Sequence, residues 1–363
     1  MLLSAVLIVR DEAHCIGPCL ASVQGVADEI VVVDTGSLDD TRALALAGGG
    51  RVFDFAWCDD FSAARNYALD QARGSWILYI DADEQLRPYP RARLERELAE
   101  PGLAGATVRF HPRSGYTAYR EYRLFRRDPR IRFSGAMHET IVPALDKLVA
   151  EGGSIGASDL TIDHFGYDGD QSHKLGRNLA LLTKELSRDP GRVYLWWHLG
   201  TVERDLGRHA EAEAAWQEGL RRGRLEAPPS SGVALCVSEM AKTRLARGEE
   251  CADLLAEGLA LAPDDRFLWW LQARALAEQG AFEPAMAIFR ELATLDPTGL
   301  IGRTAYDRRI FGAGAWAELG YCAFRLGRYR ESELHYREAE RLDPDSLEFR
   351  AKRVLAAARA TRP

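Results

Sequence analysis

The stretch Gly74-Ser75-Trp76-Ile77-Leu78-Tyr79-Ile80-Asp81-Ala82-Asp83-Glu84 decides the fold of the first half of this chain. Residues 75–80 are mostly apolar, β-branched or aromatic, which is typical of a strand buried on both faces. Three carboxylates, Asp81, Asp83 and Glu84, follow within four positions. Like charges this close repel each other unless a cation lies among them or water reaches them all. Oxygen ligands on a short loop suit Mg²⁺ or Mn²⁺, and the alternative is an acidic loop that only faces solvent.

The segments before this stretch alternate between apolar strands and helices. The pattern predicts strands over residues 2–9, 29–33 and 51–55, and helices over residues 10–23, 41–47 and 62–72. Such units wind into a parallel sheet with right-handed crossovers, and ligands bind beyond the carboxyl ends of the strands. We therefore expect residues 10–12, 34–37 and 81–84 along one rim. Arg65, in the first turn of its helix, would offer a guanidinium to an anion there, or would pair with Asp59 or Asp60 on the surface.

Residues 103–142 are the most basic segment of an acidic protein. The pattern predicts strands over residues 106–110, 122–126 and 131–139, and a last strand-like stretch over residues 160–167. Most of the arginines are expected to face solvent, while one or two that face the rim would hold a leaving diphosphate. These arginines are Arg109, Arg113, Arg120, Arg123, Arg126, Arg127, Arg130 and Arg132.

The second half of the chain changes to Ala, Leu, Glu and Arg with helical periodicity, and it contains an internal repeat. The copies are Trp196-x-x-Leu199-Gly200 with Gly207, Ala212 and Trp216, then Trp269 with Ala273, Gly280, Ala285, Phe289 and Pro297, and then Trp316-x-x-Leu319-Gly320 with Gly327, Tyr336, Ala339 and Pro344. Their offsets resemble the tetratricopeptide repeat, a helical hairpin of about 34 residues, with a degenerate copy over residues 233–263. The small residues let paired helices approach, and the large ones fill the seam between them. We expect an α/β domain over residues 1–170, a linker helix over 171–190 and all-α repeats over 191–363.

Composition limits the classes of function. A formal net charge of -7 argues against a general nucleic-acid binder, which needs clustered positive charge. No apolar run approaches the roughly 20 residues of a membrane span. Residues 1–9 lack the basic region and the cleavage site of a signal peptide, so we expect a strand there and a cytoplasmic protein. The six cysteines contain no Cys-x-x-Cys pair, which favours reduced, mostly buried thiols over a disulfide framework or a zinc site.

Four motifs in order resemble the family 2 glycosyltransferases of GT-A fold. They are Leu7-Ile8-Val9-Arg10-Asp11-Glu12, residues 32–41 around Asp34-Thr35-Gly36-Ser37, Phe61-Ser62-Ala63-Ala64-Arg65-Asn66, and the opening stretch over residues 74–84. Four ordered motifs over about eighty residues are far more specific than any one of them. The sequence Trp57-Cys58-Asp59-Asp60-Phe61-Ser62 is most similar to that of the sublancin-type peptide S-glycosyltransferases. The resemblance implies a nucleotide-diphospho-sugar transferase domain with a Rossmann-like, mostly parallel sheet, followed by the helical repeats.

The resemblance also implies roles for single residues on the donor side. Asp34 would hydrogen-bond the nucleotide base, Arg65 would lie near the base and diphosphate, and Asp81 would lie near the ribose. A carboxylate suits the imide N–H of uracil, so the donor is expected to be a UDP-sugar. The full donor-binding set that we expect is Arg10, Glu12, Asp34, Arg65, Asp81 and Ala82.

Two further elements of the family are present near the end of the first half. Residues 135–139 resemble its Gly-x-x-His-Glu element, which implies Glu139 as the base that takes the acceptor's proton, with His138 beside it as a second catalytic candidate. Residues 162–167 resemble its Ile-x-His-x-Gly-Tyr element, whose histidine returns to the metal. We therefore expect Asp83 and His164 to bind one Mn²⁺ or Mg²⁺ ion, which would neutralise the leaving diphosphate.

Three functions are compatible with these residues. The first is an inverting, metal-dependent glycosyltransferase that moves a sugar from a UDP-sugar to a Cys thiol or a Ser/Thr hydroxyl of a peptide or protein, with the repeats binding that acceptor or a second subunit as in a homodimer. The second is a transferase with a saccharide acceptor in lipopolysaccharide or cell-surface glycan synthesis. The third is a non-enzymatic repeat scaffold that carries an inactive transferase domain.

Overall fold

The computed structural model describes residues 1–112, 114–166, 172–226, 232–300, 302 and 304–361. Arg113 and Tyr167, both named above, lie outside these ranges. The chain forms two compact units. Unit 1 consists of Met1–Leu181 with Ile301–Ala305, and unit 2 of Leu182–Leu300 with Tyr306–Pro363. The division falls within helix α6 (Ser172–Arg188).

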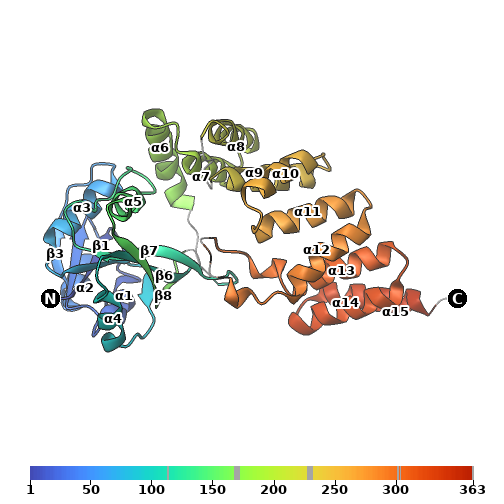
Figure 1. Ribbon diagram of the computed structural model, residues 1–363, viewed down its shortest axis with the longest axis horizontal. Helices are drawn as coiled ribbons and strands as arrows, with labels where there is room; N and C mark the ends of the chain where they lie inside the picture. The colour runs from blue at the N-terminus through green and yellow to red at the C-terminus, as the bar shows by residue number, and fades with distance from the viewer. Residues whose placement is uncertain (113, 167–171, 227–231, 301, 303, 362–363) are drawn as a thin grey trace. The chain divides into compact units, whose positions relative to one another are not determined.

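Unit 1 is built around one mixed sheet of eight strands in the order β3-β2-β1-β4-β7-β6-β8-β5 (Figure 1). The strands are β1 (Leu3–Val9), β2 (Glu29–Asp34), β3 (Arg51–Asp54), β4 (Trp76–Tyr79), β5 (Glu84–Leu86), β6 (Leu103–His111), β7 (Tyr119–Arg126) and β8 (Ser154–His164). Strands β3, β2, β1 and β4 are parallel, as expected from the sequence. In their register Val9 pairs with Asp34, so the loops after β1 and β2 begin at the same edge.

Helices cover both faces of this sheet. Leu3 and Leu7 of β1 point to one face, where they pack with α1 (Ile16–Val23), α2 (Thr41–Ala47) and α4 (Arg91–Leu98). Val6 of β1 and Val31 and Val33 of β2 point to the other face, where they pack with α3 (Phe61–Gln71) and α5 (Val142–Ala150). This alternation within β1 explains its continuous apolar sequence, because each side chain is buried on one face or the other.

The second half of the sheet corrects several expectations. β4 pairs antiparallel with β7, β7 antiparallel with β6, β6 parallel with β8, and β8 antiparallel with β5, so this half of the sheet is mixed, while four of the seven pairs in the whole sheet are parallel. Residues 131–139 form no strand, because Gly135 and His138 have φ angles of 94° and 49°, which interrupt an extended backbone. Helix α1 begins at Ile16 and not at Arg10, since Asp11 has φ 55°. The Asp11 side chain instead accepts a hydrogen bond from the backbone N–H of Leu38.

Unit 2 is a stack of helical hairpins. The helices after α6 are α7 (Val193–Asp205), α8 (His209–Gly223), α9 (Gly232–Ala246), α10 (Ala252–Leu261), α11 (Arg266–Glu278), α12 (Phe282–Thr294), α13 (Ala313–Arg325), α14 (Tyr329–Leu342) and α15 (Leu347–Ala360), with 3₁₀ turns at Pro297–Gly299 and Arg308–Ile310. The three expected repeats correspond to α7/α8, α11/α12 and α13/α14, and the degenerate copy to α9/α10.

The expected packing of small against large residues holds in this unit. A methyl group added to Gly200 would lie 2.2 Å from Trp216 Nε1, and one added to Gly320 would lie 2.9 Å from the Tyr336 ring. Helix α7 therefore approaches α8 closely only because position 200 has no side chain. Within the described parts of the whole chain, no helix combines the length and apolar character needed to cross a membrane.

Candidate active site

The loops after β1 and β2 are joined by side-chain hydrogen bonds at the rim of the sheet. Asp34, which is 5% exposed, accepts hydrogen bonds at Oδ1 from the backbone N–H groups of Gly36 (2.9 Å) and Ser37 (2.8 Å). Gly36 has φ 108°, a conformation that disfavours a side chain. The turn thus fixes the Asp34 carboxylate, and its Oδ2 has no hydrogen-bond partner in the described part of the chain. That oxygen is suited to accept a ligand N–H.

Arg10 and Glu12 lie on the same rim and meet a residue that the sequence did not suggest. Glu12 N donates to Thr41 Oγ1 at 2.7 Å, and the Arg10 side chain is about half exposed. Arg177 of α6 lies near both of them, with its guanidinium 5.8 Å from the centre of the Phe61 ring. Partial desolvation lowers the pKa of Arg177, although the residue is exposed, and the positive charge of Arg10 lowers it further. Two guanidinium groups that repel each other beside one carboxylate favour binding of an anion.

Arg65 links two carboxylates from distant parts of the chain. Helix α3 begins after Asp60, whose side chain accepts from Ala63 N, and this places Arg65 in the interior. Its Nη2 donates to Asp81 Oδ1 at 2.8 Å, and its Nε donates to Glu139 Oε1. The guanidinium also lies 5.0 Å from the Tyr79 ring. The alternative surface pairing of Arg65 with Asp59 or Asp60 is therefore wrong, and Glu139 is placed at the rim through a buried ion pair.

Arg123 of β7 forms the second cationic centre. Its side chain is 6% exposed, and its Nη2 donates to Glu84 Oε1 at 2.8 Å. Its Nη1 lies 3.6 Å from Asp81 Oδ2, and its Nε lies 3.3 Å from Glu121 Oε2. Most arginines of this segment were expected to face solvent, but Arg123 is buried, because β7 pairs with β4 and turns this side chain toward the acidic loop.

The two guanidinium groups divide the carboxylates into different charge states. Burial would raise the pKa of Asp81, but Arg65 and Arg123 outweigh it and hold that pKa below its usual value. Glu84 is 1% exposed, and its Oε2 accepts from Asp81 N at 2.9 Å. Burial raises the pKa of Glu84 to about 8, against the opposing effect of Arg123. Glu84 thus holds the loop by its hydrogen bond to the Asp81 backbone and is mostly protonated at pH 7, while Asp81 remains ionised at the rim.

Asp83 and His164 lie next to each other although they are far apart in the sequence. Strand β5 pairs with β8 so that Glu84 is opposite His164, and Phe165 N donates to the Asp83 carbonyl at 2.9 Å. His164 Nε2 lies 3.4 Å from Asp83 Oδ2, and Nδ1 is 2.9 Å from the Pro112 carbonyl. Burial lowers the pKa of His164, but Asp83 outweighs it and raises the pKa above its usual value. A bond from Nδ1–H to a carbonyl is the arrangement that presents Nε2 to a metal.

Gly166 lets the Asp83 carboxylate lie against the backbone of residue 166. A methyl group at this position would lie 1.8 Å from Asp83 Oδ2 and 3.1 Å from His164 Nε2. One carboxylate and one imidazole side by side fit a divalent ion that takes its other ligands from a substrate. Of the remaining candidates, Ala82 is buried in the loop and His138 is half-buried, with the left-handed backbone described above.

Sequence reasoning missed Arg177 and the steric role of Gly166, and it expected one or two arginines of residues 103–142 at the rim without selecting Arg123. A buried Arg123 could have been inferred from its alternation with Leu124 on a strand that neighbours an acidic loop. Arg177 has no such signal, because its position near Arg10 depends on where α6 packs.

The comparisons with known proteins agree with this architecture. Residues 4–145 match the model for Glycosyl transferase family 2, and residues 313–346 match the model for Tetratricopeptide repeat. A TPR repeat-containing protein of Synechococcus elongatus is 37% identical over 231 residues, which cover 61% of this chain and 57% of that protein. The lipopolysaccharide core biosynthesis glycosyltransferase LpsC of Rhizobium meliloti is 36% identical over 155 residues, 39% of this chain and 57% of LpsC. The chain thus spans just over half the length of these two relatives.

Two matches of lower sequence identity each cover about half of this chain. The SPbeta prophage-derived glycosyltransferase SunS of Bacillus subtilis is 26% identical over 199 residues, 51% of this chain and 45% of SunS. A structure of glucosyl-3-phosphoglycerate synthase from Mycobacterium tuberculosis with Mn²⁺ and UDP matches 52% of this chain and 79% of its own, with a TM-score of 0.37 and 19% identity. At that score the fold assignment rests on the sheet topology and the family match. The first half of the chain therefore contains a family 2 glycosyltransferase domain of GT-A type, and the second half contains tetratricopeptide repeats.

Proposed function

We propose that this protein is an inverting, metal-dependent glycosyltransferase that moves a sugar from a UDP-sugar to a thiol or hydroxyl group of a peptide or protein. The observation that carries the proposal is the convergence of Asp83 and His164, eighty-one positions apart, beside a loop whose Asp81 is held ionised by Arg65 and Arg123. A surface loop with no ligand would gain nothing from two buried guanidinium groups, whose desolvation is costly.

The donor would be bound by groups already fixed along the rim. Asp34 Oδ2 would accept the N–H of the uracil base, and Asp81 would accept a ribose hydroxyl. Arg10 and Arg177 would contact the diphosphate, which relieves their mutual repulsion. Asp83 and His164 would hold a Mn²⁺ or Mg²⁺ ion, which when bound supplies positive charge to the leaving diphosphate.

Transfer would then be a direct displacement at the anomeric carbon. The acceptor's sulfur or oxygen forms a bond to that carbon while the bond to the diphosphate oxygen breaks, so the configuration inverts and UDP leaves. Glu139 Oε2 would take the acceptor's proton, since its Oε1 is occupied by Arg65. Arg65 in turn fixes the orientation of the Glu139 carboxylate and ties it to the Asp81 loop.

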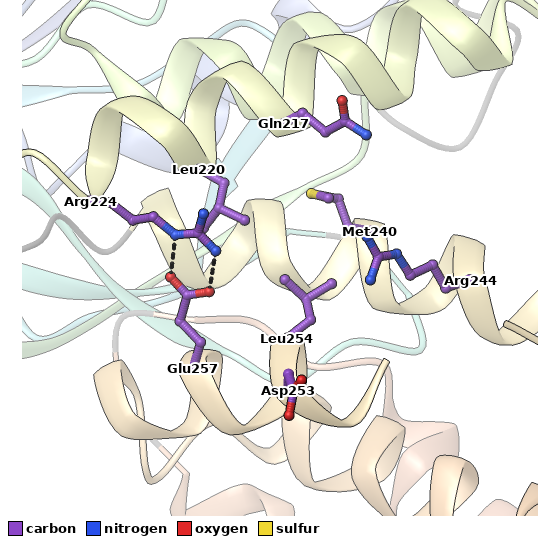
Figure 2. A pocket seen from close by; sticks show the side chains of 8 residues that line it. All are labelled: Gln217, Leu220, Arg224, Met240, Arg244, Asp253, Leu254 and Glu257. Atoms are coloured by element: carbon purple, nitrogen blue, oxygen red, sulfur yellow. Dashed lines mark hydrogen bonds and ion pairs between the residues drawn. The ribbon is translucent and has the colours of Figure 1, made fainter. Parts of the chain in front are cut away.

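The repeats would recruit the acceptor. Unit 2 contains a cavity of about 330 Å³ between α8, α9 and α10. Figure 2 shows that Leu220, Met240 and Leu254 lie between the Arg224–Glu257 ion pair on one side and Arg244 on the other. Three apolar side chains among charged ones would suit one large peptide side chain with an adjacent charge, and methionine adapts its shape to such a ligand.

The proposal is tested by incubating the full chain with Mn²⁺, a panel of UDP-sugars and either a peptide library or an oligosaccharide library, with mass detection. We expect one sugar to be added to a peptide and Arg244→Glu to raise the KM for that peptide without changing hydrolysis of the donor. Modification of oligosaccharides alone would favour a saccharide acceptor, a second candidate that the similarity to LpsC supports. Absence of both transfer and hydrolysis with every donor would leave the scaffold function.

A further inference from the structure

A second group of potential metal ligands lies at the carboxyl end of β1, apart from Asp83 and His164. The carboxylate of Glu12, the imidazole of His14 and the thiol of Cys15 place one ligand atom each within 4.8 Å of one another. The Cys15 thiol donates a hydrogen bond to Glu12 Oε2 at 3.1 Å, which a bound ion would replace. His14 is exposed, while Glu12 and Cys15 are half-buried, so the group is open to solvent on one side. We propose that Glu12, His14 and Cys15 form a second cation site, which takes a borderline-soft divalent ion of the Zn²⁺ type.

The backbone around these residues is held in place before any ion binds. Cys15 N and Ile16 N donate to the Glu12 carbonyl at 3.1 and 2.9 Å, which closes a turn that brings the Glu12 and Cys15 side chains together. Thr41 Oγ1 fixes Glu12 N, and Asp39 Oδ2 accepts from Ala13 N at 3.1 Å. The connection between β2 and α2 thus supports the segment, so that little ordering is needed on binding.

The dimensions fit a small tetrahedral ion. Zinc bonds of about 2.0–2.3 Å to oxygen, nitrogen and sulfur place tetrahedral ligand atoms roughly 3.3–3.8 Å apart. The Glu12 and Cys15 atoms are already slightly closer than this, and the exposed His14 side chain can rotate to complete the set. Three protein ligands leave a fourth position for water or an external ligand, as in zinc sites that are not purely structural.

The ligand chemistry separates this site from the one at Asp83. A thiolate and an imidazole favour Zn²⁺ or Co²⁺ and are poor ligands for Mg²⁺ and Mn²⁺, whereas the Asp83 site offers no sulfur. Binding would convert the Cys15 thiol to a thiolate and release its proton to solvent. The spacing of the six cysteines gave no sign of this site, because two of its three ligands are not cysteines. The Glu12 carboxylate also lies beside Arg10 and Arg177 of the proposed donor site, so the two proposals share this residue.

The test is a Co²⁺ titration of the reduced, metal-free full chain, followed by absorption spectroscopy. We expect a thiolate-to-cobalt charge-transfer band that saturates at one ion per chain, disappears on addition of Zn²⁺ and persists in excess Mg²⁺. Cys15→Ser should abolish the band, and His14→Ala should weaken Co²⁺ binding at least about tenfold. Cys58→Ser, which removes an exposed cysteine elsewhere in unit 1, and His164→Ala should both retain it.

The far-UV circular dichroism and melting temperature of metal-free Cys15→Ser should match those of the unmodified chain, which separates loss of a ligand from loss of fold. The proposal is overturned if no thiolate band forms, if the band survives in Cys15→Ser, or if it is lost in Cys58→Ser or His164→Ala.

Discussion

Replacing Arg123 by methionine tests whether the buried charges around the acidic loop support one another. The substitution keeps the length of the side chain but leaves Glu84, which is 1% exposed, without its cation. Arg123 also contacts the Tyr79 and Phe110 rings at 4.4 and 4.9 Å, so some packing is lost as well. Hydrogen bonds to charged groups contribute about 1.5–3 kcal/mol, and breaking a buried ion pair costs about 3–5 kcal/mol.

The pH decides which of these costs applies. Glu84 has a folded-state pKa of about 8, above its ordinary 4.5, so its contribution to stability is fully present at low pH and is lost as pH rises through 8. Without Arg123 that pKa rises further, and the loss continues above pH 8 at about 1.4 kcal/mol per pH unit. We therefore expect Arg123→Met to destabilise unit 1 by about 1.5–3 kcal/mol at pH 7 and by about 3–5 kcal/mol near pH 9.5.

The opening of unit 1 can be followed at Cys19, which is fully buried and donates its Sγ–H to the Asp81 carbonyl. Thiol labelling of this residue in increasing urea, read by mass spectrometry of its peptide, gives the free energy of opening without unfolding the repeats. Arg130→Met is the matched control, since that arginine is exposed and should change the free energy by less than about 1 kcal/mol. Adding Glu84→Gln to Arg123→Met should remove the pH dependence. Equal effects of the two arginine substitutions, or no increase with pH, would refute the reasoning.

Three further substitutions test other parts of the structure. Gly166→Ala should lower Mn²⁺ affinity at least about tenfold by calorimetry, because the methyl group displaces the Asp83 carboxylate. Gly17→Ala, which has open space around it, should not change that affinity. Equal Mn²⁺ affinities of the two variants would contradict the site. Arg177→Ala should weaken UDP binding severalfold in a fluorescence titration while Arg130→Ala does not, and unchanged binding would remove Arg177 from the donor site. Gly200→Ala should destabilise the repeats by about 1–3 kcal/mol in thermal unfolding through overlap with Trp216, with Gly299→Ala of the same unit as the control; a stabilised Gly200→Ala protein would contradict the close helix packing.

The parallel half of the sheet and the repeats were predictable because their residues carry local patterns. Continuous apolar runs such as 29–33 and the repeated Trp–Gly spacing determine elements whose packing partners are adjacent in sequence. The short strand β5 was not predictable, since Glu84–Leu86 has no strand pattern and forms only by pairing with β8. Residues 131–139 were misassigned as a strand because their apolar residues fill the core from a loop, as Phe133 does against Tyr79.

In the candidate site, too, only the residues with a local sequence pattern were predictable. Asp34, Asp81 and Asp83 could be placed on one rim because each follows a strand of the parallel sheet. The pairings of Arg65 with Glu139 and of Arg123 with Glu84 join residues 74 and 39 positions apart, and no local pattern encodes them. The resemblance to a family supplied His164, and the β5–β8 pairing supplies the physical reason why it lies beside Asp83.

The central claim is that Asp83 and His164 hold one divalent cation on the donor's diphosphate. Electron spin-echo spectroscopy of Mn²⁺ bound with UDP to the full chain tests it directly, since nitrogen and phosphorus nuclei near the ion modulate the echo. We predict modulation from one imidazole nitrogen and from phosphorus, with the nitrogen signal absent in His164→Ala. Bound Mn²⁺ that shows phosphorus but no nitrogen coupling in the unmodified chain would contradict it.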